Sequence, residues 1–478
     1  MPKTIVRHLA YLFYLGVLIL PILVLDHEAA LIRPFRDQLS SYIALIALNI
    51  LLLEFFLSGR IRFLSRHLGL DWVLQTHQLF ARVALAFLVI HPFIYSLPNH
   101  PNHSPGPATS EYLGMNGAGL ISGIAALIAL IAIVALALGR EEAKMRYETW
   151  RFTHMLLAVI VSALGLYHVL AVGFYIQQHT LQIYYLSLGI LAALSLAWTY
   201  ILKPLTQSRE AYAITKIENI TSQQFLLTIK KLSGSLPKIQ PGQYLWLKYG
   251  SSKPYPENPF SIALVNHEQK EMSLLIKVVG DFTAQLQQAR IGERIIYIDA
   301  AYGDFAQHAL NSEKPIVMIA GGIGLAPFLS VLSKAKEIAF KNKIHCIYGN
   351  RLEDQIIDIT KLIQLADLKS LTIETIVSEP TAAYTGLCGM IDLNNIQTSL
   401  QKAQLNPKEC LFFICGPSAM IDATEAALEQ LAVPLAQIDA EKFQYNLAAH
   451  TPRTQATLAR CIIGTLLIIA VSVWRSLS

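Results

Sequence analysis

Six apolar runs, each close to the length of a membrane-spanning helix, follow one another up to about residue 203. They cover residues 9–25, 41–57, 75–96, 119–138, 154–172 and 183–202. A helix needs about 20 mostly apolar residues to cross the hydrocarbon core of a bilayer. The chain of 478 residues is 53% hydrophobic and only 15% charged, which excludes an ordinary soluble protein. The pattern predicts a six-helix α-helical membrane bundle over residues 1–203.

The first and last apolar runs need separate arguments. Lys3 and Arg7 precede the first run, as in a signal peptide, but no clear small-x-small cleavage site follows. We therefore expect a retained helix. A seventh run, Cys461–Trp474, is flanked by two arginines and is short for a span. It predicts either an extra C-terminal transmembrane helix, placed at residues 456–475, or a segment at the membrane interface, and we favour the helix.

Basic residues concentrate in alternate connections between the apolar runs. The loops 97–118 and 173–182 contain no Lys or Arg. The segments after the second, fourth and sixth runs carry Arg60, Arg62, Arg66, Arg140, Lys144, Arg146, Arg151, Lys203 and Arg209. Because positive charge favours the cytosolic side, we expect a multi-pass protein of a plasma or inner membrane with its large polar portion in the cytosol. The five cysteines form no CxxC pair and suit a reducing compartment.

Two pairs of histidines interrupt the third and fifth apolar runs. His77 and His91 lie in the third run, and His154 and His168 occupy the fifth at the same separation of fourteen positions. This spacing is close to four helical turns, so both members of a pair face roughly the same side, about 21 Å apart along the axis. A polar side chain at bilayer depth is costly and marks a functional site.

Both histidine-bearing runs cross the membrane in the same direction, so two such helices facing each other would present histidines at matching depths. Imidazole on both faces of a haem iron leaves no open coordination position, which suits electron transfer. A helix–helix hydrogen bond or a proton relay is the alternative for a single histidine, and the repeated spacing favours haem. Arg82, within the third run, either pairs with a haem propionate or contacts lipid headgroups or a neighbouring helix.

The chain changes character over residues 207–310, where short alternating strands and turns predict a β-barrel domain. Phe260 could stack on a flavin ring, and Ser261 could hydrogen-bond the edge of that ring. Downstream, Gly280 permits close approach of the backbone to a phosphate, and Thr283 can donate to a pyrophosphate. Lys277, in the same stretch, is assigned to this cofactor site.

Residues 313–446 alternate strands with helices and predict a doubly wound α/β domain with a parallel sheet. The segment PIVMIAGGIGLAPFLSVL is typical of a buried strand, a Gly-rich turn and a helix. In this turn Gly321, Gly322 and Gly324 let the backbone approach a pyrophosphate at a helix N-terminus. The segment therefore predicts a dinucleotide site, although its spacing is not GxGxxG.

Two further strand ends carry candidate residues for the same dinucleotide. Cys415, Gly416 and Pro417 follow a strand at the sheet edge where ligands bind in such folds. Arg351 lies just past another strand and either contacts a 2′-phosphate or is a solvated surface residue.

Over roughly residues 40–445 these motifs resemble the ferric reductase and NADPH oxidase superfamily. That family joins a six-helix haem-binding membrane domain to a ferredoxin–NADP reductase-type dehydrogenase. The resemblance implies that His77 pairs with His154, and His91 with His168, as ligands of two b-type haems. It also implies an FAD site at the barrel motifs and an NADPH or NADH site at the glycine turns. Roles in the reaction are implied for Ser261, Cys415, Glu441 and Phe443.

The chain departs from the family at several points. Asn258 stands two residues before Phe260, where the family usually has Arg or His, so one charge-assisted phosphate contact is in question. Family chains commonly end near the aromatic that corresponds to Phe443, whereas this chain continues to a further apolar run. The absence of a CxxxxCxxC signature argues against an iron–sulfur relay.

The resemblance implies an electron relay from cytosolic NAD(P)H through FAD and two haems to an acceptor on the outer face. A ferric iron chelate is the first expectation, because the outer loops 97–118 and 173–182 are short. Reduction of O₂ to superoxide is the alternative, and a partner protein or a quinone stays open. A nucleotide-regulated transporter is remote, since only Glu54 is acidic near a span. Membrane lipid is an expected partner, and nucleic acid is not.

Overall fold

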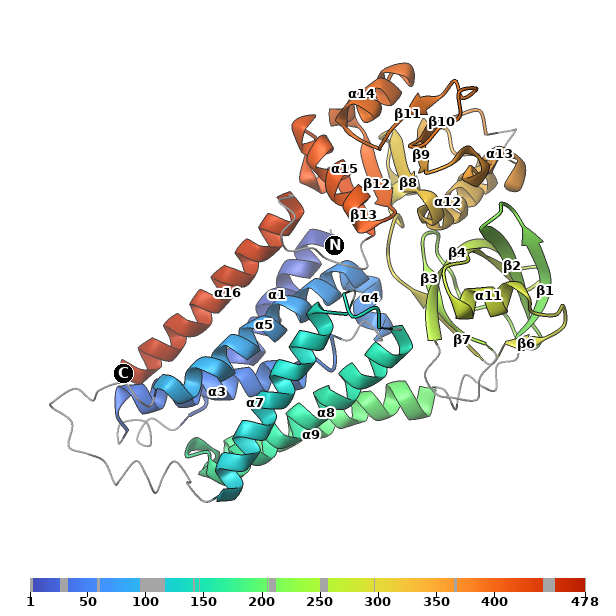
Figure 1. Ribbon diagram of the computed structural model, residues 1–478. Coiled ribbons are helices and arrows are strands. Elements are labelled where there is room, and N and C mark those ends of the chain that lie inside the picture. Colours follow the sequence, from blue (N-terminus) through green and yellow to red (C-terminus); the bar gives the residue numbers. More distant parts are fainter. Residues whose placement is uncertain are drawn as a thin grey trace. The chain divides into compact units, whose positions relative to one another are not determined.

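The computed structural model describes residues 3–25, 33–57, 61–94, 117–140, 142–145, 147–203, 205, 212–249, 257–295, 297–364, 368–441 and 452–477. The chain divides into two compact units (Figure 1). The first unit consists of Met1–Ile61, Trp72–Leu202 and Thr457–Ser478. The second consists of Arg62–Asp71 and Lys203–Ala456.

Within the described ranges, seven helices are long and apolar enough to cross a membrane. They are α1 (Lys3–Leu23), α3 (Phe35–Leu53), α5 (Leu70–Ile94), α7 (Gly117–Leu138), α8 (Tyr147–Val172), α9 (His179–Ala197) and α16 (Pro452–Leu477). The six apolar helices of the N-terminal region and the apolar C-terminal helix are confirmed. The chain is a multi-pass membrane protein.

Several helices extend beyond the apolar runs from which they were predicted. α8 begins at Tyr147, well before the run that starts at residue 154. α16 covers 26 residues, so the short run within it does not limit its length. The backbone hydrogen bonds of a helix continue through polar residues, so a helix does not stop where apolarity stops. α9 continues into a π-helical turn, Trp198–Leu202.

Polar side chains inside the first unit bind backbone carbonyls or one another. Asn49 of α3 donates to the carbonyl oxygen of Val17 in α1 at 2.7 Å, and Tyr184 of α9 donates to Asn49 Oδ1 at 3.0 Å. Tyr11 of α1 donates to the carbonyl oxygen of Arg460 in α16 at 2.7 Å. In a lipid environment such bonds satisfy groups that would otherwise be costly, and here they connect separate helices.

An antiparallel half-barrel forms the first half of the second unit. In its described part, seven strands lie in the order β6-β1-β2-β5-β4-β3-β7. These strands are β1 (Tyr212–Asn219), β2 (Gln224–Lys231), β3 (Tyr244–Lys248), β4 (Glu257–Asn266), β5 (Glu271–Lys277), β6 (Arg294–Ile295) and β7 (Tyr297–Tyr302). Side chains such as Phe225, Leu227 and Ile229 of β2 alternate into a buried core. The short helix α11 (Asp281–Gln287) follows β5.

A parallel sheet forms the other half of the unit. Its described strands follow the order β11-β10-β9-β8-β12-β13. They are β8 (Ile316–Gly321), β9 (Ile344–Asn350), β10 (Leu371–Val377), β11 (Leu387–Cys388), β12 (Leu411–Cys415) and β13 (Ile438–Glu441). The accompanying helices are α12 (Ala326–Glu337), α13 (Ile359–Leu362), α14 (Leu393–Lys402) and α15 (Ser418–Gln430). The strand order reverses at β8, which makes its carboxyl end the topological switch point.

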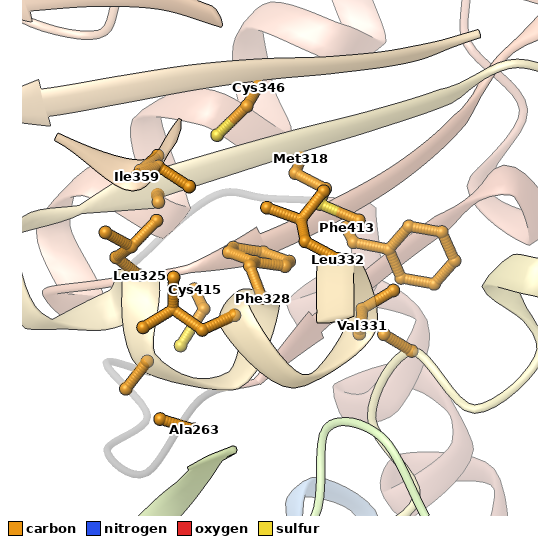
Figure 2. Packing of buried hydrophobic residues seen from close by; sticks show 14 of the residues in the cluster. Ala263, Met318, Leu325, Phe328, Val331, Leu332, Cys346, Ile359, Phe413 and Cys415 are labelled. Carbon is orange, nitrogen blue, oxygen red and sulfur yellow. The ribbon is translucent and has the colours of Figure 1, made fainter. Parts of the chain in front are cut away.

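One buried cluster fills the face of the parallel sheet that α12 covers (Figure 2). Phe328 and Leu332 of α12 pack with Met318 of β8 and Phe413 of β12. Ala263 of β4 belongs to the same cluster. The barrel and the sheet therefore share a core, which holds the ends of their strands in a fixed relation.

The helix α4 (Arg62–Leu68) also belongs to the second unit. Arg62 donates to Asp299 of β7 at 2.7 Å, and Arg66 donates to the carbonyl oxygen of Ala301 at 3.2 Å. Lys203 forms an ion pair with Oδ2 of the same Asp299, and this oxygen also accepts a hydrogen bond from Tyr302 at 2.5 Å. The Asp299 side chain is fully buried, so its charge is balanced inside the protein.

Candidate functional site

His77 of α5 and His154 of α8 face each other in the first unit. Their ring centroids are 6.2 Å apart and their planes are inclined by 62°. Two metal–nitrogen bonds of about 2 Å each, with the offset of each nitrogen from its ring centre, give a separation of about 6 Å. The spacing therefore fits a metal ion held between the two rings. Trp150 lies one turn before His154 and packs on its ring at a centroid distance of 5.3 Å.

A carboxylate lies behind the first of these histidines. Glu54 directly follows α3, and its Oε2 lies 2.5 Å from Nδ1 of His77. Tyr14 of α1 donates to the other oxygen, Oε1, at 3.4 Å. A carboxylate on Nδ1 fixes the tautomer and leaves the lone pair of Nε2 for a metal. This contact joins the end of α3 to α5. In the sequence, Glu54 was noted only as an acidic residue near a span, which is a weak indication of a transporter.

The second histidine pair has a different surrounding. His168 of α8 donates from Nδ1 to the carbonyl oxygen of Gly119 in α7 at 2.9 Å, which again leaves Nε2 as an acceptor. Its ring lies against Gly123, where an added Cβ atom would be 2.8 Å from Cε1 of His168. His91 of α5 and His154 each carry a buried Nδ1 without a hydrogen-bond partner among the described residues. The donor set of both pairs fits axial ligation of haem.

Arg82 of α5 hydrogen-bonds its own helix. Its Nη1 donates to the carbonyl oxygen of Gln78 at 3.1 Å. The alternatives of a haem propionate and of a lipid or helix contact stay open as predictions.

The Gly-rich turn after β8 touches the turn after β12 in the second unit. A Cβ atom at Gly324 would lie 2.2 Å from the carbonyl oxygen of Cys415, so this close approach requires glycine. At Gly321 it would lie 3.1 Å from Cδ of Pro417. The two turns contain the predicted residues Gly321, Gly322, Gly324, Cys415, Gly416 and Pro417. They meet at the switch point, where ligands bind in sheets of this kind.

Cys415 and Glu441 lie side by side in this region. They are register partners of the parallel strands β12 and β13, and both are buried. Burial, reinforced by the charge of Glu441, raises the pKa of the Cys415 thiol well above its ordinary value. Cys415 is therefore a neutral thiol near pH 7 rather than a nucleophilic thiolate. Phe443, predicted beside Glu441, lies outside the described residues.

The predicted flavin residues gather on β4 and around α11. Phe260 stacks on Phe282 with ring centroids 6.2 Å apart and planes inclined by 16°. Ser261 pairs with Tyr244 of β3, and Asn258, three residues before Ser261, pairs with Leu247 in the same ladder. The buried amide nitrogen of Asn258 has no hydrogen-bond partner in the described part of the chain. It is a donor available to a phosphate oxygen, in place of the Arg or His of the family.

Thr283 shapes the turn before α11. Its hydroxyl donates to the carbonyl oxygen of Gly280 at 2.9 Å and accepts from the amides of Val279 and Gly280 at 3.0 and 3.2 Å. Its single proton is thus directed into the turn. A Cβ atom at Gly280 would meet no atom within 4 Å, so the space beside this residue is open. Lys277 ends β5 just before this turn.

Arg351 lies directly after β9 on the exposed surface. Its Nε donates to Glu379 at 2.8 Å, and the two side chains are 70% and 56% exposed. Asn350, the last residue of β9, lies closer to the glycine turn: its Oδ1 would be 3.9 Å from a Cβ atom at Gly322. Asn350 is buried at the dinucleotide crevice and was missed by the sequence reasoning, which had no signal for it beyond its place at a strand end.

Comparison with known protein families accounts for both units. The ferric reductase like transmembrane component matches residues 43–165, the FAD-binding domain residues 209–324 and the oxidoreductase NAD-binding domain residues 318–426. The first match contains His77, His91 and His154 and ends three residues before His168. The second match contains the barrel, and the third contains the glycine turn. The chain belongs to the ferric reductase and NADPH oxidase superfamily.

Curated relatives of this superfamily member match its dehydrogenase part. The electron transfer component of anthranilate 1,2-dioxygenase from Acinetobacter baylyi is 27% identical over 215 residues, covering 44% of this chain and 60% of the relative. The corresponding toluate 1,2-dioxygenase component from Pseudomonas putida is 25% identical, covering 48% and 66%. The chain thus spans less than two thirds of the length of these relatives. They support an FAD- and NAD(P)H-dependent oxidoreductase.

Among solved structures, the ferredoxin reductase of carbazole 1,9a-dioxygenase has a TM-score of 0.43 and 20% identity, covering 49% of this chain and 69% of that one. A flavohemoglobin from Malassezia yamatoensis has a TM-score of 0.48 and 16% identity, covering 86% of this chain and 99% of that one. The three family matches identify the chain as a transmembrane flavin oxidoreductase of the ferric reductase type.

Proposed function

We propose that this protein moves electrons from cytosolic NAD(P)H through FAD and two b-type haems to ferric chelates on the outer face of the membrane. The observation that carries the proposal is the separation of 6.2 Å between the rings of His77 and His154 within the ferric reductase component. The repeated spacing of fourteen residues supports a second site at His91 and His168.

The residues that would hold the haems are already prepared for ligation. Gly119 fixes the tautomer of His168, and Glu54 fixes that of His77, so each ring offers Nε2 to a metal. Haem with two axial histidines supplies one-electron transfer without an open coordination position. No acid–base residue is needed at either pair, and the helices contribute position and burial.

The dehydrogenase residues would bind and orient the two nucleotides. The amide of Asn258, which has no partner among the described residues, could donate to a flavin phosphate, and the space beside Gly280 is open. The contact of Gly324 with Cys415 brings the backbone amides of the glycine turn to the crevice, where they can bind a pyrophosphate. The neutral thiol of Cys415 adds no charge beside the nicotinamide.

The identity of the electron acceptor is the most specific part of the proposal. The outer connection after α8 contains only a short 3-10 turn, Tyr175–Gln177, before α9 begins at His179. A short connection of this kind supports access for a soluble chelate to the outer histidine pair. Reduction of O₂ is the alternative, and reoxidation of the purified protein by ferric citrate or by O₂ distinguishes the two acceptors.

Visible spectroscopy of the purified full-length protein tests the proposal. We expect sharp reduced b-type haem bands after anaerobic addition of NADPH or NADH, and their reoxidation by ferric citrate. Absence of these bands even with dithionite would refute the haem sites. Reduction by dithionite but by neither nucleotide would point to a defective flavin site around Asn258. Reoxidation by O₂ with superoxide formation, and none by ferric citrate, would replace the ferric acceptor with oxygen.

A further inference from the structure

The two histidine pairs differ in what lies behind their ligands. Nδ1 of His77 meets the carboxylate of Glu54 at 2.5 Å. In the other pair, Nδ1 of His168 meets the neutral backbone carbonyl of Gly119 at 2.9 Å. One pair is therefore supported by a carboxyl side chain and the other by a backbone carbonyl.

An acceptor on Nδ1 changes the ligand strength of the opposite nitrogen. A carboxylate attracts the Nδ1 proton more strongly than a carbonyl oxygen does and makes the imidazole more basic. A more basic axial ligand stabilises the oxidised iron over the reduced iron, which lowers the reduction potential. The negative charge of the carboxylate acts in the same direction, because it disfavours adding an electron nearby.

Glu54 is held in place from two sides. Tyr14 donates to Oε1 while His77 occupies Oε2, and Glu54, Tyr14 and Phe80 are all buried. The Tyr14 ring packs edge-on against Phe80 of α5 at a centroid distance of 4.9 Å. The carboxylate thus cannot turn away from His77 without breaking buried contacts of α1 and α5.

On the basis of the proposed function, we propose that Glu54 is a positioning residue that lowers the potential of the His77–His154 haem below that of the His91–His168 haem. With haem bound at both pairs, this difference would favour electron transfer from the His77–His154 site, which would be oxidised, to the His91–His168 site, which would be reduced. No proton needs to leave either ligand. The direction of flow is thereby set by an acidic side chain outside the coordination sphere.

A redox titration of the full-length protein, followed by the haem absorbance, tests this role. In Glu54→Gln the side chain keeps its shape but loses its charge, so we expect the lower of the two midpoint potentials to rise. A loss of at least tenfold in the equilibrium constant for outward transfer is expected, which is 59 mV for one electron. Glu54→Asp retains the charge and should restore part of the difference.

The higher potential serves as the internal control, because Gly119 and His168 are untouched by these substitutions. Equal shifts of both potentials, or none, would overturn the role of Glu54. If Glu54→Gln loses haem, Tyr14→Phe serves as a second variant. It removes only the second hydrogen-bond donor to the carboxylate and should lower the same midpoint potential further. An unchanged midpoint potential in Tyr14→Phe would also overturn the inference. A wild-type protein without haem would instead refute the proposed function, which is a separate result.

Discussion

At the scale of single residues, the absence of a side chain at Gly123 determines where His168 can lie. A Cβ atom there would be 2.8 Å from Cε1 and 3.0 Å from Nδ1 of the histidine. We expect Gly123→Ala to displace the ring, break its bond to Gly119 and halve the haem content per chain, measured by the pyridine haemochrome assay. Gly16→Ala in α1 meets no atom within 4 Å and is the matched control. Unchanged haem content in Gly123→Ala would contradict this account of the site.

Arg351 offers a test of coenzyme preference. Its guanidinium is exposed and paired with Glu379, and exposed pairs of this kind contribute little to stability. If the side chain contacts a 2′-phosphate, Arg351→Ala should raise the KM for NADPH about tenfold and leave that for NADH unchanged. Glu379→Gln, which releases the arginine, should lower the KM for NADPH. Steady-state kinetics with both coenzymes decides, and equal effects on both would rule out the contact.

The cysteines of the parallel sheet predict a dependence on pH. Burial raises the pKa of Cys346 from 9.0 to about 12, whereas Cys388 is exposed. Since only a thiolate reacts, iodoacetamide at pH 8 should label Cys388 of the folded protein and spare Cys346, as peptide mass mapping would show. At a pH between the unfolded and folded pKa values of Cys346, its thiol is deprotonated in the unfolded chain but keeps its proton in the folded one. The stability of the fold should therefore decrease as the pH rises through that range. Rapid labelling of Cys346 would show that the sheet core is open.

At the scale of elements, the apolar runs predicted which helices exist but not where they end. The apolar run of residues 461–474 is shorter than the helix α16, because the helical hydrogen bonds continue through the polar first turns of that helix. The histidine spacing was readable because it lies within single helices. The contact of Glu54 with His77 was not, since it depends on how α3 packs against α5. The buried position of the Asn258 amide likewise depends on neighbouring strands that the strand pattern alone does not define.

The ion pairs between α4 and β7 predict a position at which a single substitution lowers the stability of the second unit. Asp299 is buried between Arg62 and Lys203, so Asp299→Asn leaves a buried cation without its counter-charge. We expect a loss of about 3 kcal/mol, seen as a lower Tm of the second unit by its flavin fluorescence. Glu218→Gln breaks the exposed pair with Lys216 and should leave Tm nearly unchanged. Equal effects of both substitutions would mean that the buried carboxylate has no special importance.

At the scale of the whole molecule, the number of crossings determines the sides on which the termini lie. Seven of the described helices are long and apolar enough to cross a membrane, and seven crossings would place the two ends on opposite faces. With a cytosolic N-terminus, alkaline phosphatase fused after Ser478 should be active, and the same fusion before α16, after residue 446, should be inactive. Activity in neither fusion would mean that α16 lies along the membrane surface.

The order of strands in the parallel sheet also has a consequence for synthesis on the ribosome. The apolar strand β8 lies between β9 and β12, and β12 begins only at Leu411, long after β8 ends at Gly321. At about 5–20 residues per second, this gap lasts on the order of ten seconds. During this interval one edge of β8 is without its partner, while the helices before it are already entering the membrane. The nicotinamide crevice is therefore among the last parts to form, and a pause or premature stop in this stretch would expose an aggregation-prone strand.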